Sequence, residues 1–163
     1  MTVGKNIEIS KNIRNASVDD ASRIAEILVF SKRKNYRRIF NDDIGSFVEL
    51  QVYPLAKKYA DRPELLNDTF VYDDEFVKGV IHIAGPEIKE LYVEPFFENR
   101  GIGGKLIEFA KTKLNCYELW VLNENERAIK FYKQHGFHEA NETRPVPEIP
   151  NSNVLETKMV RII

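Results

Sequence analysis

Apolar residues recur along the chain with two periods, which divide it into expected helices and strands. A spacing of three to four residues, typical of an amphipathic helix, occurs in residues 21–31, 46–60, 106–114 and 125–136. Runs rich in β-branched and aromatic residues predict strands at residues 12–16, 69–85, 87–95, 116–122, 137–141 and 154–162, the second of these being a hairpin that turns at Asp73-Asp74. The order β α α β β β α β α β β indicates an α/β (α+β) fold on a mixed, mostly antiparallel sheet.

Local residue types refine the ends of these elements. Ser17 and Asp20 have the spacing of a capping box before the first helix. Pro54 predicts a kink or boundary in the second, and Gly136 a left-handed cap after the last. The segment "ETRPVPEIPNSN" (residues 142–153) contains three prolines, which predict an extended loop between the last two strands.

The stretch "NRGIGGKL" (residues 99–106) joins a predicted strand to a predicted helix. Backbone N–H groups at a helix N-terminus attract anions, and glycines allow a phosphate to approach closely. The spacing excludes two common nucleotide loops: a dinucleotide fingerprint beginning at Gly101 would need glycine where Leu106 stands, and a Walker A loop would need glycine where Asn99 stands.

The wider stretch "LYVEPFFENRGIGGKL" resembles the central motif of the GNAT superfamily of acyl-CoA-dependent N-acetyltransferases, a strand ending in V-x-P and then Q/R-x-x-G-x-G/A opening a helix. A second stretch, "LWVLNENERAIKFYKQHGF", resembles the motif that follows in that family. Val93 and Pro95 match the first motif, and Asn125, Tyr132 and Gly136 the second. The resemblance implies the GNAT fold, with about six to seven strands and about four helices.

The same resemblance implies that acetyl-CoA is the co-substrate. In the family, backbone amides of the glycine loop hold the pyrophosphate, and the preceding strand pairs with the pantetheine arm. The positions of this chain that match are Leu91, Tyr92, Val93, Asn99, Arg100, Gly101, Ile102, Gly103, Gly104, Lys105 and Asn125.

Two residues match catalytic positions of the family. Tyr132 matches the general acid, although a tyrosine on a helix face is often only a packing residue. Glu87 lies where some members place a catalytic base, and simple alternation puts it on one strand face with Leu91 and Val93, opposite Glu90. Ordered water is the alternative route for deprotonating the amine, and Glu87 can equally be an exposed strand-end carboxylate.

One residue departs from the family pattern. Glu98 stands where Gln or Arg is usual, and a carboxylate beside a pyrophosphate is unfavourable. We expect Arg100 and Lys105, which flank it, to offset the charge.

The acceptor is expected to contact residues 36–68 and 141–153, where the resemblance is weak. The basic segment "KRKNYRR" (residues 32–38) can be a solvated helix end, a nucleic-acid contact or an attraction for an acidic acceptor, whereas residues 41–43 and Glu49 could seat an ammonium group. Neither His82, His135 and His138 nor Cys116 has a metal-ligand spacing, so we predict no metal and a core role for Cys116.

Composition supports one domain over residues 1–163. The 24 basic and 25 acidic residues make nucleic-acid coating improbable, and no apolar run is long enough to cross a membrane. A single cysteine and the lack of a signal-peptide pattern favour the cytoplasm. The sequence leaves open a monomer or a homodimer.

These observations predict an acetyl-CoA-dependent N-acetyltransferase that acts on a primary amine of a small molecule or peptide, by direct attack in a ternary complex. The rival hypotheses are a non-catalytic acyl-CoA-binding regulatory domain and a nucleic-acid module that uses residues 32–38.

Overall fold

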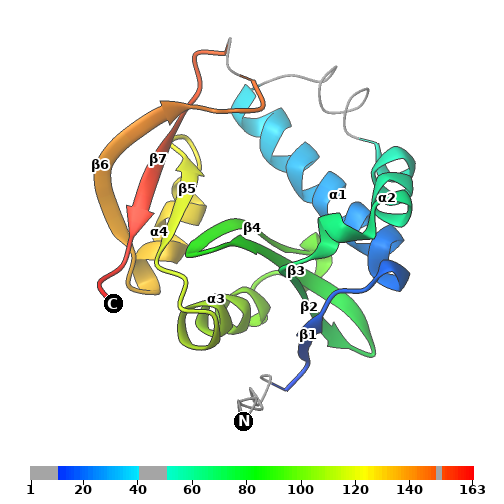
Figure 1. The fold of residues 1–163 in the computed structure, drawn as a ribbon. Coiled ribbons are helices and arrows are strands. Elements are labelled where there is room, and N and C mark those ends of the chain that lie inside the picture. Colours follow the sequence, from blue (N-terminus) through cyan, green and yellow to red (C-terminus); the bar gives the residue numbers. More distant parts are fainter. Residues whose placement is uncertain (1–10, 41–50, 150–151) are drawn as a thin grey trace.

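The computed structural model describes residues 11–40, 51–149 and 152–163. Within them the strands are β1 (Ile13–Asn15), β2 (Thr69–Asp74), β3 (Phe76–Ala84), β4 (Glu87–Val93), β5 (Glu118–Leu122), β6 (His138–Pro145) and β7 (Leu155–Val160). The α-helices are α1 (Ala21–Phe40), α2 (Val52–Asp61), α3 (Ile102–Lys113) and α4 (Glu126–Gln134). This order is the one that the sequence predicts (Figure 1).

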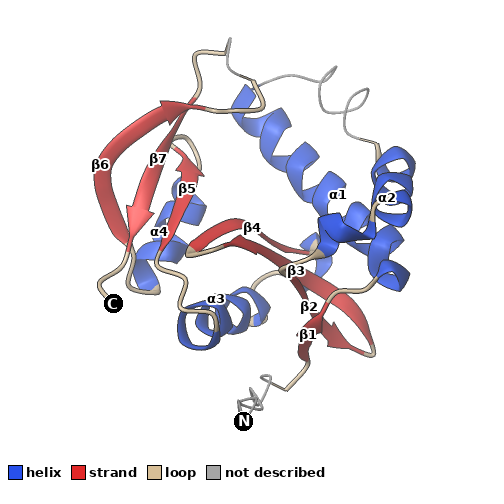
Figure 2. Ribbon diagram, viewed as in Figure 1, coloured by secondary structure: helices blue, strands red, loops and turns tan. Residues whose placement is uncertain are grey.

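The described strands form one seven-stranded sheet in the order β1-β2-β3-β4-β5-β7-β6. Every neighbouring pair is antiparallel except β4 with β5, which is parallel. Helices α1 and α2 lie on one face, and α3 and α4 on the other (Figure 2). The expectation of a mixed, mostly antiparallel sheet flanked by four helices is confirmed.

Each face of the sheet buries its own apolar cluster. On the first face, Ile24, Ile27 and Leu28 of α1 pack with Val71 and Val80 of the sheet. On the second, the predicted apolar face of α3 packs on residues from both halves of the sheet; the buried members include Leu106, Ile107, Ala110, Ile81, Leu119 and Met159. The helices therefore hold the sheet from both sides and fix where its strand ends lie.

Two predicted boundaries are wrong, and the structure defines a third, the position of Pro54 in its helix. Strand β6 continues to Pro145, into the segment expected to be a loop. Proline is tolerated there because β6 is an edge strand, so its missing N–H can face away from the neighbouring strand. The β2–β3 turn falls at Glu75, with a φ of 66°, rather than at Asp73-Asp74. Pro54 stands in the first turn of α2, where proline is tolerated.

Glycine at position 79 is required by close packing between β3 and α3. A Cβ added there would lie 3.0 Å from methyl carbons of both Ile102 and Leu106. Those two side chains belong to the core cluster under the glycine loop, so the contact sets how near α3 approaches the sheet.

Replacing this glycine tests the packing. Gly79→Ala is expected to lower the free energy of unfolding by about 1–3 kcal/mol, because the core must shift to admit the methyl group. Urea denaturation measures it. Gly104→Ala is the matched control: its Cβ would meet His135 at an ordinary 3.5 Å, and alanine favours a helix, so its unfolding free energy should not fall. An unchanged value for Gly79→Ala would contradict the packing argument.

Arg14 joins β1 to the residues just before α1 and to the end of β2. Its guanidinium donates to both carboxylate oxygens of Asp20, at 2.8 and 2.9 Å, and to Asp73 at 2.9 Å. Asp20 also accepts from the backbone N–H of Ser17 at 2.9 Å, as in the predicted capping box. The hydrogen bonds from Arg14 hold the pKa of Asp20 below its ordinary value of 3.8.

A carboxyl whose pKa is lowered in the folded state stabilises the fold above its unfolded pKa and loses that contribution as the pH falls through the folded value. Asp20→Asn should therefore lower the free energy of unfolding by about 1–2 kcal/mol at pH 7. The difference from wild type should shrink below about pH 4, measured by urea titration at each pH. Asp19→Asn, at the exposed neighbouring position, is the control; an equal loss there would contradict the role of Asp20.

Candidate functional site

Strands β4 and β5 separate in the middle of the sheet. Among the described residues they pair at only two positions, Glu87 with Glu118 and Ile88 with Leu119. Beyond these pairs the strands diverge (Figure 1). The stretch Leu91–Val93 of β4 is paired with β3 on one side, and its other edge faces the opening.

The glycine loop lies at the end of β4, after a short 3-10 helix at Pro95–Phe97. Gly101 is the N-cap of α3 with a φ of 84°, and Asn99 also has a positive φ of 62°. No side chain caps this helix terminus. The first N–H groups of α3, at the mouth of the β4–β5 opening, thus have no side-chain cap, which is the arrangement that an anion site requires.

Helix α4 follows β5 and supplies Asn125 and Tyr132. The Asn125 side chain accepts from the N–H of Ala128 at 3.2 Å, so it caps the helix. Phe131 packs beside Gly103 of α3, where a Cβ would lie 3.5 Å from its ring. The first turn of α3 therefore packs against the C-terminal half of α4.

Tyr132 is half-buried among aromatic rings on the α3–α4 face. Its ring centroid is 5.3 Å from that of Phe131 and 6.0 Å from that of Phe137. Burial raises the pKa of Tyr132 from its ordinary value of 10.0 to about 12. The side chain therefore keeps its proton at any physiological pH, as a hydrogen-bond or proton donor must.

A β-bulge changes the faces that alternation predicts for the carboxylates of β4. Glu90 pairs with His82, but the next pair is Ile88 with Ile83, which leaves Lys89 as an extra residue. Glu87 and Glu90 consequently share one face, whereas Leu91 and Val93 pack in the opposite cluster. The predicted common face of Glu87 with Leu91 and Val93 is wrong, because the bulge shifts the period by one residue.

The two carboxylates have different partners. Glu87 lies where β4 still pairs with β5, and it accepts from Lys89 at 3.2 Å. Glu90 lies further along, toward the opening, and forms a 2.8 Å ion pair with Lys32 of α1, both side chains being one-quarter exposed. Tyr59 of α2 is near this pair; burial, together with the charge of Glu90, raises its pKa to about 12.

The face that carries Glu90 also carries residues that sequence reasoning missed. Trp120 of β5 lies under the guanidinium of Arg144 from β6, 4.0 Å from its ring centroid. Lys158 of β7 pairs with Glu118 at 3.1 Å. Strand periodicity places Trp120 on this face once the β5–β7 register is known, but the sequence alone does not give that register.

Lys32 is not simply part of a solvated helix end, since it pairs with Glu90. The residues considered as a seat for an ammonium group, 41–43 and Glu49, lie outside the described part of the chain.

Glu98 is not offset by its sequence neighbours as expected. Its carboxylate pairs with Arg127 of α4 at 2.8 Å and with Lys34 of α1 at 3.2 Å. The guanidinium of Arg100 instead lies over the rings of Phe96 and Phe97. Lys105 donates to the hydroxyl of Tyr72 at 3.3 Å. The charge of Glu98 is thus offset by residues that are distant in sequence.

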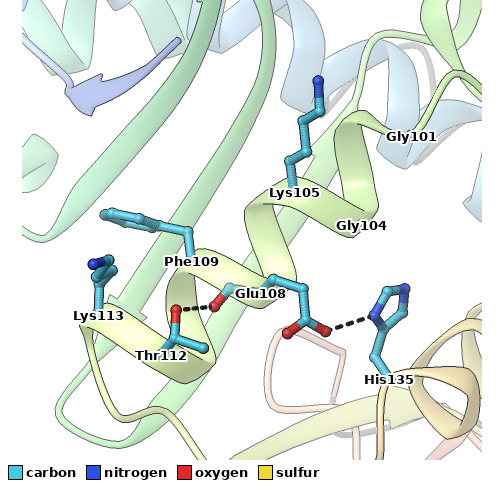
Figure 3. A pocket seen from close by; sticks show the side chains of 8 residues that line it. All are labelled: Gly101, Gly104, Lys105, Glu108, Phe109, Thr112, Lys113 and His135. Atoms are coloured by element: carbon cyan, nitrogen blue, oxygen red, sulfur yellow. Dashed lines mark hydrogen bonds and ion pairs between the residues drawn. The ribbon is translucent and has the colours of Figure 1, made fainter. Parts of the chain in front are cut away.

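A hollow of about 440 Å³ begins at the glycine loop and runs along α3. Its lining residues are Gly101, Gly104, Lys105, Glu108, Phe109, Thr112, Lys113 and His135. Figure 3 shows Glu108 directed to His135, 3.0 Å away, with Lys105 pointing away from that pair. The hollow therefore has both cationic and acidic side chains in its lining, and it adjoins the N-terminus of α3 at Gly101.

Other expected features can be placed in the described residues. Cys116 is buried, and burial raises its pKa to about 11, which makes it an unreactive core residue. Within these ranges no His, Cys, Asp and Glu side chains cluster in a way that would hold a metal ion. None of the described helices has the length and apolar character needed to span a membrane.

The fold is that of solved acetyltransferases. The coenzyme A complex of the PaiA N-acetyltransferase from Thermoplasma acidophilum is 19% identical, covers 92% of this chain and 98% of its own, and has a TM-score of 0.64. An N-acetyltransferase from Staphylococcus aureus Mu50 (16% identical, 91% and 98% covered) has a TM-score of 0.68. Ard1 from Thermoplasma volcanium (22% identical, 93% and 96% covered) has a TM-score of 0.60.

The sequence matches agree with the fold. Residues 66–139 match the acetyltransferase (GNAT) domain family. An uncharacterized N-acetyltransferase from Methanocaldococcus jannaschii is 50% identical over 58 residues. That match covers 32% of this chain and 26% of the relative, so the chain spans about a quarter of the relative's length. Residues 66–139 thus match the GNAT family of acetyltransferases, and the fold of the described chain agrees with that match.

Proposed function

We propose that the protein is an N-acetyltransferase that moves an acetyl group from acetyl-CoA to a primary amine of a small molecule or peptide. The observation that carries the proposal is the open edge of β4 beside the uncapped N-terminus of α3. An extended polyamide arm can pair with an open strand edge, and a pyrophosphate can bind a helix N-terminus. Coenzyme A contains both groups, and the PaiA relative was crystallised with it.

The cofactor would extend along the opening. Its pyrophosphate would accept hydrogen bonds from N–H groups of residues 99–105, where Gly101 and Asn99 adopt positive φ. Its pantetheine arm would pair with the edge of β4 at Leu91–Val93. Asn125, at the N-terminus of α4, would border the same channel.

Transfer proceeds by direct attack in a ternary complex. The neutral amine attacks the thioester carbonyl, and a backbone N–H near Leu91 or Tyr92 stabilises the oxyanion. As the C–S bond breaks, Tyr132 donates a proton to the leaving thiolate. Glu87 and Glu90 are on the sheet face opposite Tyr132. If the acceptor enters from that face, a carboxylate there can take the amine proton directly or through water.

Cofactor binding is tested first, without knowledge of the acceptor. Acetyl-CoA and CoA should raise the melting temperature, because a ligand that binds only the native state stabilises it by mass action. Calorimetry should give a dissociation constant below 1 mM, on the order expected of a co-substrate. A lack of binding at millimolar concentration would refute the proposal at its first step.

Acetyl transfer is then assayed by release of free CoA across a panel of aminoglycosides, polyamines, amino acids and peptide N-termini. Turnover of at least one class is expected. Tight cofactor binding with no transfer to any amine would instead favour a non-catalytic acyl-CoA-binding domain. Salt-sensitive binding of RNA or DNA, lost on replacing Arg37 and Arg38, would favour the nucleic-acid hypothesis.

Tyr132→Phe tests the general acid. It should lower kcat by about 10²–10⁴-fold and change the dissociation constant of acetyl-CoA by less than about threefold, because only proton donation is lost. Tyr117→Phe, at a tyrosine just before β5, is the control and should retain activity. Equal kcat values for Tyr132→Phe and wild type would show that Tyr132 only packs among its aromatic neighbours.

A further inference from the structure

Three charged side chains meet at the mouth of the β4–β5 opening. Glu98 lies just before the glycine loop and accepts from Arg127 Nη1 at 2.8 Å and from Lys34 Nζ at 3.2 Å. Arg127 Nη2 also donates to the side-chain oxygen of Asn99 at 3.2 Å. Lys34 comes from α1 and Arg127 from α4, so helices on opposite faces of the sheet meet at this loop.

The position of Arg127 relates it to the anion site. It is the second residue of α4, next to the capped N-terminus at Asn125, and its guanidinium contacts Asn99 of the glycine loop. The N-terminal ends of α3 and α4 both carry partial positive charge. Two cations against one carboxylate leave the group of three with a net positive charge at the point where the phosphates of a cofactor would enter.

We propose that Arg127 is a cofactor-binding residue that supplies positive charge to the pyrophosphate and masks the carboxylate of Glu98. The inference rests on the proposed function, since it needs coenzyme A as the ligand. It explains how the chain can hold Glu98 where the family motif has Gln or Arg: the positive charge comes from α4 instead of from the loop.

Arginine suits both tasks. A guanidinium has five N–H donors in a planar fork, and the recorded bonds of Arg127 use one donor on each terminal nitrogen. Its side chain is about half exposed, at 52%, so a phosphate can reach it, whereas Glu98 is only 23% exposed. The bonds to Glu98 and Asn99 hold the side chain toward the loop before the ligand binds.

The alternative is an ordinary surface ion pair, which contributes little to stability or binding. The two interpretations differ in what happens when Arg127 is removed. If Arg127 masks Glu98, its loss removes one cation from the phosphates and leaves Lys34, at 3.2 Å, as the remaining recorded ion-pair partner of the Glu98 carboxylate, so affinity for the cofactor falls for two reasons. If the pair is only a surface contact, affinity for the cofactor should not change.

Calorimetry with CoA on four variants separates these outcomes. Arg127→Gln should raise the dissociation constant about tenfold, the loss expected for one charge-assisted hydrogen bond. Lys130→Gln, which removes one positive charge a turn further along α4, is the matched control. Its dissociation constant should stay within about twofold of wild type. The dissociation constant of Glu98→Gln alone should stay within about threefold of wild type. Adding Glu98→Gln to Arg127→Gln should recover at least about threefold in affinity, since the double variant no longer has the carboxylate.

The ligand and the salt concentration identify the phosphate involved. The loss of affinity in Arg127→Gln should be equally large with 3′-dephospho-CoA, because this ligand retains the pyrophosphate. The difference in affinity from wild type should diminish at high salt. Unfolding in urea without ligand checks that each variant keeps its fold.

Several results would overturn the inference. These are equal affinities of Arg127→Gln and Lys130→Gln, no recovery in the double variant, or a loss confined to CoA, which would place Arg127 on the 3′-phosphate. Failure of the wild type to bind CoA would instead refute the proposed function itself.

Discussion

The separation of β4 from β5 is the constraint on which the rest of the structure depends. A sheet normally pairs its central strands along their length, yet here the parallel pair covers two positions. The apolar clusters on both faces compensate, because α1 and α3 each pack on β3 and β4 and hold that half of the sheet together. The result is a strand edge in the middle of the sheet that has no strand paired with it beyond Ile88 among the described residues, close to the N-terminus of α3.

Much of this arrangement can be predicted from the chain. The periods of apolar residues give the elements in order, and the spacing of Gly101 and Gly103 after Val93 and Pro95 marks the loop that opens α3. Such features are local, since they depend on residues a few positions apart. Asn125 and Gly136 bound α4 for the same reason, one as its cap and the other with a φ of 89°.

The features that could not be predicted depend on pairing between distant segments. One extra residue, Lys89, places Glu87 and Glu90 on one face, and nothing in "EIKELYV" distinguishes a bulge from regular alternation. The partners of Glu98 come from positions 34 and 127, whose approach requires the complete fold. Strand β6 exceeds its predicted length because an edge position tolerates Pro145. Sequence reasoning therefore predicted the conformation of the glycine loop better than the arrangement of side chains on the face that carries Glu90.

The two edges of the sheet have a consequence for how copies of this chain can associate. In the described residues, β1 is three residues long, and β6 is interrupted between Glu139 and Thr143 before it ends at Pro145. Short, bulged or proline-containing edge strands present few consecutive N–H and C=O groups to another strand. Joining two sheets edge to edge into one continuous sheet is thus disfavoured, although the interior edge of β4 beyond Ile88 has no strand paired with it among the described residues.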